Sequence, residues 1–93
     1  MISLQDIEDI TDLTREEIAA IAEHEHVGMV KAAIMGNDLM HKRHGPQHVQ
    51  QIICEDIRKA LHKGDLPHAR ALFATLRQFL ADHPEAVRGA EPR

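Results

Sequence analysis

Four consecutive residues, Glu23-His24-Glu25-His26, combine carboxylate and imidazole side chains, which are ligands that iron and zinc take in proteins. Glu23 and His26 are three residues apart, so in a helix their side chains lie on neighbouring faces. Di-iron carboxylate bundles use this Glu-x-x-His spacing together with a Glu from a facing helix. The run therefore predicts a carboxylate–histidine metal site on the helix that contains it.

Two carboxylates fall within otherwise apolar helical faces, Glu25 in the first long helix and Asp56 in the next one. An unpaired buried carboxylate is costly, so each needs a cation, a histidine or a metal ion beside it. If the first long helix stops at Gly36, Glu25 lies level with Glu55 and Asp56; if it continues to His41, Glu25 lies level with His62. The predicted metal ligands are Glu23, His24, Glu25, His26, Asp56 and His62.

The metal predicted for this site is iron if carboxylates dominate the ligand set and zinc if histidines do. A dimer axis through the site would double the ligands and give room for two metals. The alternative is that Glu25 and Asp56 pair with Arg or Lys, inside the bundle or across a dimer. The chain is then a non-catalytic helical interaction or structural module. Neither alternative specifies an enzymatic reaction.

Four further histidines are expected to be exposed to solvent and not to form a second metal site. His41, His44, His48 and His83 are expected near one end of an antiparallel bundle, where imidazoles can bind zinc, nickel or copper. Solvated residues at helix ends are the more frequent arrangement, and that is the interpretation we favour for these four.

Helical periodicity and capping signals predict an all-α fold, a small bundle of three main helices plus a short N-terminal helix. Thr14 and Glu17 form a capping box at the start of the first long helix, and Gly45-Pro46 separates it from the next. Gly64 marks a tight turn before the last helix. The predicted helices span residues 3–10, 14 to at least 35, 46–63 and 66–82.

The apolar faces predict how these helices pack. The last helix carries one continuous stripe, expected in the core, of Ala69, Leu72, Phe73, Leu76, Phe79 and Leu80. The first long helix has a second apolar face of Val27, Val30 and Ile34, and a helix that is apolar on two sides is packed on two sides. In so short a chain the second side is expected to meet another copy, so we predict that the bundle is completed by homodimerisation.

Composition limits the partners. The 93 residues fit one helical domain, predicted over residues 1–84, with a frayed tail over 85–93.

Only 2% of residues are aromatic, the net charge is −4 and no basic patch is visible, so nucleic acid is not an expected partner. The longest apolar stretch, residues 27–35, is too short to span a membrane. One cysteine and no signal-peptide pattern suit the cytoplasm.

Two segments, Thr14–Val27 and Gly64–Pro84, resemble a family of small bacterial α-helical proteins in which a Glu-His-Glu-His run precedes a helical hairpin. That resemblance covers most of the chain and carries no activity with it. A looser similarity to ferritin-like di-iron bundles rests on Glu23-x-x-His26. A full ferritin-like bundle has a second such motif in one chain, which here only a dimer would supply.

Overall fold

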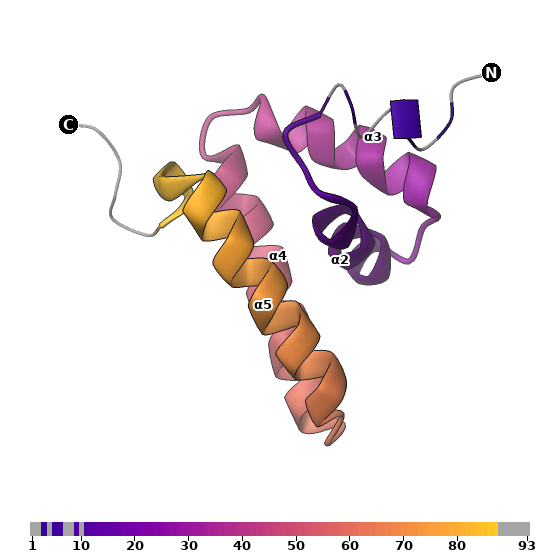
Figure 1. Cartoon of the computed structure of the whole chain (residues 1–93), viewed down its shortest axis with the longest axis vertical. Helices are drawn as coiled ribbons and strands as arrows, with labels where there is room; N and C mark the ends of the chain where they lie inside the picture. Colours follow the sequence, from indigo (N-terminus) through magenta and orange to yellow (C-terminus); the bar gives the residue numbers. More distant parts are fainter. Residues whose placement is uncertain (1–2, 4, 7–8, 10, 88–93) are drawn as a thin grey trace.

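The computed structural model describes residues 3, 5, 6, 9 and 11–87, and these residues form helices with no strand. Figure 1 shows a long α4–α5 hairpin with α2 and α3 packed beside its upper half. The elements are α2 (Arg15–Glu25), α3 (Met29–Met40), α4 (Gly45–His62), α5 (Leu66–Asp82) and a 3-10 turn, η1 (Pro84–Ala86). The all-α prediction is confirmed.

The α4–α5 hairpin follows the sequence signals closely. Pro46 lies in the first turn of α4, where its missing N–H removes no helical hydrogen bond. Gly64 adopts a left-handed φ of 74°, which glycine tolerates without a Cβ penalty. The Asp65 side chain then accepts a hydrogen bond from the backbone N–H of His68 at 3.2 Å and caps α5. Both helices begin and end within one residue of the predicted positions.

The prediction of one long helix from residue 14 to at least residue 35 is wrong, because the chain folds there as two helices, α2 and α3. The capping box at its start is present, but the helix ends at Glu25 and His26 takes the left-handed conformation, with φ 57° and ψ 47°. The N–H groups of His26 and Val27 both donate to the Ala22 carbonyl, which closes the end of α2. Gly28 then starts α3. The direction of the chain therefore changes in the middle of the predicted helix.

The second helix of this pair passes through Gly36 and ends at Met40, so Gly36-Asn37-Asp38 is not a stop. Gly36 is buried where a Cβ would lie 2.6 Å from Leu13 Cδ1 and 2.8 Å from Ile21 Cδ1. A small residue at this position allows α3 to pack closely against Ile21 of α2 and against Leu13 in the loop before it.

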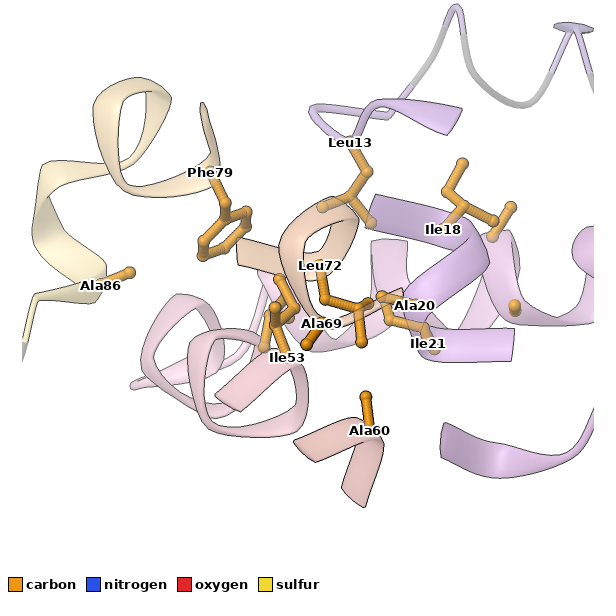
Figure 2. Packing of buried hydrophobic residues seen from close by; sticks show 13 residues of the cluster. Leu13, Ile18, Ala20, Ile21, Ile53, Ala60, Ala69, Leu72, Phe79 and Ala86 are labelled. Atoms are coloured by element: carbon orange, nitrogen blue, oxygen red, sulfur yellow. The ribbon is translucent and has the colours of Figure 1, made fainter. Parts of the chain in front are cut away.

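One core joins these helices. Its buried members are Leu13, Ile18, Ala20, Ile21, Ala32, Ala33, Val49, Ile53, Ala60, Ala69, Leu72, Phe79 and Ala86. Figure 2 shows Leu72 of α5 pointing toward Ala20 and Ile21 of α2. Ala86 is fully buried, so the packed structure extends beyond the predicted domain end at residue 84.

The molecule is thin, with extents of 39 × 38 × 18 Å. The end of the α4–α5 hairpin that contains Gly64 projects beyond α2 and α3 (Figure 1). Phe73 of α5, expected in the core, is 52% exposed. At this level α2 lies along Ala71, Leu72 and Thr75 on another side of α5, and no described helix covers the side that carries Phe73. The predicted stripe of α5 is therefore buried only in part.

The N-terminal prediction falls partly outside the described residues. Ser3 and Asp6 exchange backbone-to-side-chain hydrogen bonds of 3.1 and 3.2 Å, which agrees with Ser3 as a helix cap. Within the described residues, no helix has both the length and the apolar character that crossing a membrane requires.

Candidate functional site

The Glu-His-Glu-His run lies at the corner between α2 and α3, and its four side chains separate. Glu23 and His24 are in the last turn of α2 and face other helices. Glu25 is exposed, so the prediction that it lies in the middle of a buried face is wrong. That prediction assumed one continuous helix, in which Glu25 shares a face with Met29 and Ala32. Because α2 ends at Glu25 and α3 begins at Met29, these residues do not lie on one helical face.

His24 connects α2 to the middle of α4. Its Nδ1 lies 3.2 Å from Oδ1 of Asp56, and its Nε2 lies 3.7 Å from Oε2 of Glu55. Asp56 is buried, as predicted, with a side-chain exposure of 1%. The second Asp56 oxygen, Oδ2, is buried and has no hydrogen-bond partner among the described residues. The His24 imidazole lies between two carboxylates and is the histidine partner that the sequence analysis expected for Asp56.

Burial raises the pKa of the Asp56 carboxyl above its ordinary value, because the charged form loses its hydration. The hydrogen bond from His24 and its charge oppose this rise, and the nearby carboxylate of Glu23 adds to it. The site is therefore a partly compensated buried acid.

A second histidine–carboxylate contact joins α2 to α5. His68 Nε2 lies 2.6 Å from Glu23 Oε1, and both side chains are more than 40% exposed. Glu23 and His24 are adjacent in the last turn of α2, where the Glu23 side chain contacts α5 and the His24 side chain contacts α4. The two contacts fix the end of α2 against the hairpin.

The other predicted ligands lie apart from these contacts. His26 is exposed at the left-handed corner, so Glu23 and His26 do not share a helical surface, and His62 is exposed at the C-terminal end of α4. Among the described residues, no group of three or more His, Cys, Asp or Glu side chains is arranged to hold a metal ion. The predicted metal site stays a prediction.

Glu17 is a buried acid that the sequence interpretation missed. Its Oε1 accepts the Thr14 N–H at 2.8 Å as the second half of the capping box, while Oε2 is buried without a partner in the described chain. Burial raises the pKa of the Glu17 carboxyl, and hydrogen bonding from Thr14 and the charge of His83 oppose the rise. The available signal was its spacing of three and four residues from Ala20 and Ile21, which puts it on the same buried side of α2.

The surroundings of Cys54 do not activate it as a nucleophile. Cys54 is the single cysteine of the sequence, and its Sγ accepts a hydrogen bond from Gln50. Burial raises the pKa of the Cys54 thiol, which keeps it protonated, whereas a reactive cysteine needs the thiolate.

A groove is the other notable feature, and it lies between α4 and α5. Leu61, Leu66 and Phe73 line it with exposures of 53, 51 and 52%. Ile57 and two arginines, Arg70 and Arg77, complete its main outline, and its volume is about 360 Å³. These large apolar side chains belong to two helices and form one continuous surface. Sequence periodicity predicted that Phe73 lies in the core, and it did not identify Leu61 and Leu66 as part of an uncovered surface.

Comparisons of this chain with protein-family models, with curated proteins and with solved structures found no match. The function is therefore inferred from the geometry of this chain.

Proposed function

We propose that this chain is a non-catalytic helical interaction module whose α4–α5 groove takes a helix from a partner protein. The observation that carries the proposal is the gathering of Leu61, Leu66 and Phe73 at half exposure along one groove. Single exposed apolar residues are ordinary, but a contiguous apolar surface is typical of an interaction site. A groove between two helices also matches the apolar stripe of an amphipathic helix.

A nuclear magnetic resonance titration tests this function. The probe is a helical peptide of about 18 residues with a leucine stripe and uncharged glutamine flanks, long enough to form helix in water. We expect saturable amide shifts at residues 57–77, and loss of binding in a Leu61→Ser, Phe73→Ser variant. Both side chains are half exposed, so this variant should retain its helical circular dichroism. Shifts scattered over the molecule, or no shifts, would contradict the proposal.

We further propose a homodimer through the exposed side of α3. Val30 and Ile34 are 44 and 59% exposed there, on the second apolar face expected from the sequence. If two α3 helices cross antiparallel near Ile34, Lys31 of each copy comes opposite Asp38 of the other, about one turn from the crossing on either side. Asp38 also pairs with Lys42 of its own chain at 3.2 Å, so Lys31 of the other copy would join an existing exposed ion pair. The self-complementary pattern supports a second copy as the occupant of this face.

Light scattering over a concentration series tests the dimer. We expect a dimer mass that falls to the monomer mass on dilution, and a monomer at all concentrations for Ile34→Glu. Val87→Glu, which changes an exposed apolar residue outside α3, is the matched control. A wild-type chain that stays monomeric up to about millimolar concentration would exclude the dimer.

A transition-metal site is the second candidate function, and the specific observation in its favour is the unpartnered Oδ2 of Asp56 beside His24. A buried acceptor without a partner is costly, and a cation would compensate it. Metal analysis of tag-free protein tests this candidate. Less than about a tenth of an equivalent of iron or zinc, with no thermal shift on adding either, would remove it. If metal is found, Asp56→Asn with His24→Ala should lose it.

A further inference from the structure

The groove between α4 and α5 has a charge that differs from that of the chain as a whole. The net charge is −4, yet the charged residues that line the groove are Arg70 and Arg77, with no carboxylate among the described lining residues. Neither guanidinium has a hydrogen-bond or ion-pair partner in the part of the chain that the structure describes. The apolar surface is therefore accompanied by two cations that no internal acid neutralises.

A second copy of the chain fits this groove poorly. A two-fold interface places the same surface of both copies together, so Arg70 and Arg77 of one copy would approach those of the other. Like charges brought together at an interface oppose binding and exclude wrong partners. The groove and the α3 face therefore select different occupants.

The spacing of the arginines defines a binding pattern. Arg70 and Arg77 are seven residues apart on α5, which is two helical turns or about 10 Å. The groove residues of α5 extend from Leu66 to Arg77, about 16 Å along the helix axis. A partner helix of three turns covers this length, and acids seven residues apart on its flank lie level with the two arginines.

The shape of the site favours a helix over a membrane surface. The apolar residues line a concave groove between two helices, whereas membrane-surface helices present a convex apolar face to the lipid. No aromatic platform for nucleic-acid bases accompanies the arginines, since Phe73 is the single aromatic residue of the groove.

We infer that the partner of this groove is an acidic amphipathic helix. Its apolar stripe packs on Leu61, Leu66 and Phe73, and its acidic flank, with carboxylates seven residues apart, pairs with Arg70 and Arg77. The apolar contacts supply most of the affinity, while the two arginines set which helices bind and in which register. This inference rests on the proposed function and adds the chemistry of the partner to it.

Three peptides test the inference by fluorescence anisotropy. They share a leucine stripe over about 18 residues and carry Glu, Gln or Lys at two flanking positions seven residues apart. For the wild-type chain at about 50 mM NaCl we expect the Glu peptide to bind about tenfold more tightly than the Lys peptide, with the Gln peptide between them. Salt at about 300 mM should reduce the difference, because it screens exposed charges.

Charge reversal supplies the second half of the test. In Arg70→Glu with Arg77→Glu the order of the Glu and Lys peptides should invert, while the Gln peptide changes little. Lys42→Glu with Arg43→Glu makes the same change in net charge in the exposed α3–α4 connection and should leave the order unaltered. Circular dichroism of each variant shows whether the fold is retained.

The possible outcomes distinguish the acidic character of the partner from the ability of the groove to bind a helix. Equal binding of all three peptides would overturn the acidic partner and leave a helix-docking groove. Binding of none would overturn both. Saturable binding to phosphatidylglycerol-containing vesicles that depends on Arg70 and Arg77, with no peptide binding, would replace the partner helix by a lipid surface.

Discussion

His24 and Asp56 join the last turn of α2 to the middle of α4, with the imidazole Nδ1 3.2 Å from the carboxylate Oδ1. The neighbouring contact between Glu23 and His68 is shorter, at 2.6 Å, but lies at the exposed surface. Water screens an exposed pair, whereas removal of one partner of a buried pair leaves an uncompensated buried group. The longer contact therefore contributes more to keeping the native fold.

We predict that His24→Ala lowers the free energy of unfolding by about 2 kcal/mol, because it leaves Asp56 buried without its hydrogen bond. His68→Ala should lower it by less than about 1 kcal/mol. Urea unfolding at neutral pH measures both. Equal losses from the two substitutions would show that burial of Asp56 is not what makes His24 important.

Gly45 is predicted to be irreplaceable for steric reasons. A Cβ at this position would lie 1.7 Å from the Leu39 carbonyl oxygen and 2.7 Å from the carbonyl carbon, which belong to the backbone and cannot rotate away. Gly45→Ala should cost about 3 kcal/mol in unfolding free energy. Gly28→Ala is the matched control, since nothing lies within 4 Å of a Cβ there, and should cost less than about 1 kcal/mol. A similar cost for both would refute the steric argument.

Glu17 should make stability depend on pH in a defined direction. Burial raises its pKa in the folded chain, so its favourable contribution is full below the ordinary carboxyl pKa and is lost as the pH rises through the raised value. Glu17→Gln keeps an oxygen for the Thr14 N–H and removes the titration. Its stability relative to the wild type should therefore improve by about 1 kcal/mol between about pH 4 and pH 8.

The control for this prediction is Glu16→Gln, which removes an exposed acid from the same turn of α2. Thermal unfolding of both variants over the pH range gives the comparison. A constant difference between Glu17→Gln and the wild type at all pH values would mean that Glu17 does not titrate differently in the folded and unfolded chains.

The left-handed corner at His26 should be improved by glycine. The φ of 57° brings the Cβ of an L-residue close to its own carbonyl, and glycine has no such contact. We expect His26→Gly to raise the unfolding free energy by about 0.5 kcal/mol and His26→Val to lower it by more than about 1 kcal/mol, since branching at Cβ worsens the strain. If α2 and α3 formed one continuous helix in solution, His26→Gly would instead be less stable than His26→Val, because glycine is the poorer helix former.

Local chemistry determined which elements could be predicted. The α4–α5 hairpin was predictable because Pro46, Gly64 and Asp65 act on their own backbone and need no tertiary contacts. The break at His26 was not, since no proline or glycine lies at that position and histidine tolerates the left-handed region only moderately well. One unpredicted corner moved Glu25 to the surface and separated Glu23 from His26.

The same distinction applies to the candidate sites. Asp56 could be identified as a buried acid because its neighbours along α4 are apolar at helical spacing, and His24 was among the residues proposed to lie near it. His24 faces α4, and Glu25 does not, because of the way α2 crosses α4. Sequence periodicity does not predict how two helices cross. The exposure of Phe73 likewise depends on which side of α5 is covered by α2, a property of the whole arrangement.

The projecting end of the α4–α5 hairpin should also open more readily than the rest of the molecule. Near Gly64 each helix packs mainly on the other, whereas residues around Val49 and Ile53 lie in the shared core. Opening at the turn exposes less apolar surface, so amide hydrogens there exchange at a lower free energy. A helix seated in the groove would add the missing contacts at this end. The end of the groove that contains Leu61 and Leu66 would thus be the part of the molecule whose order depends most on being occupied.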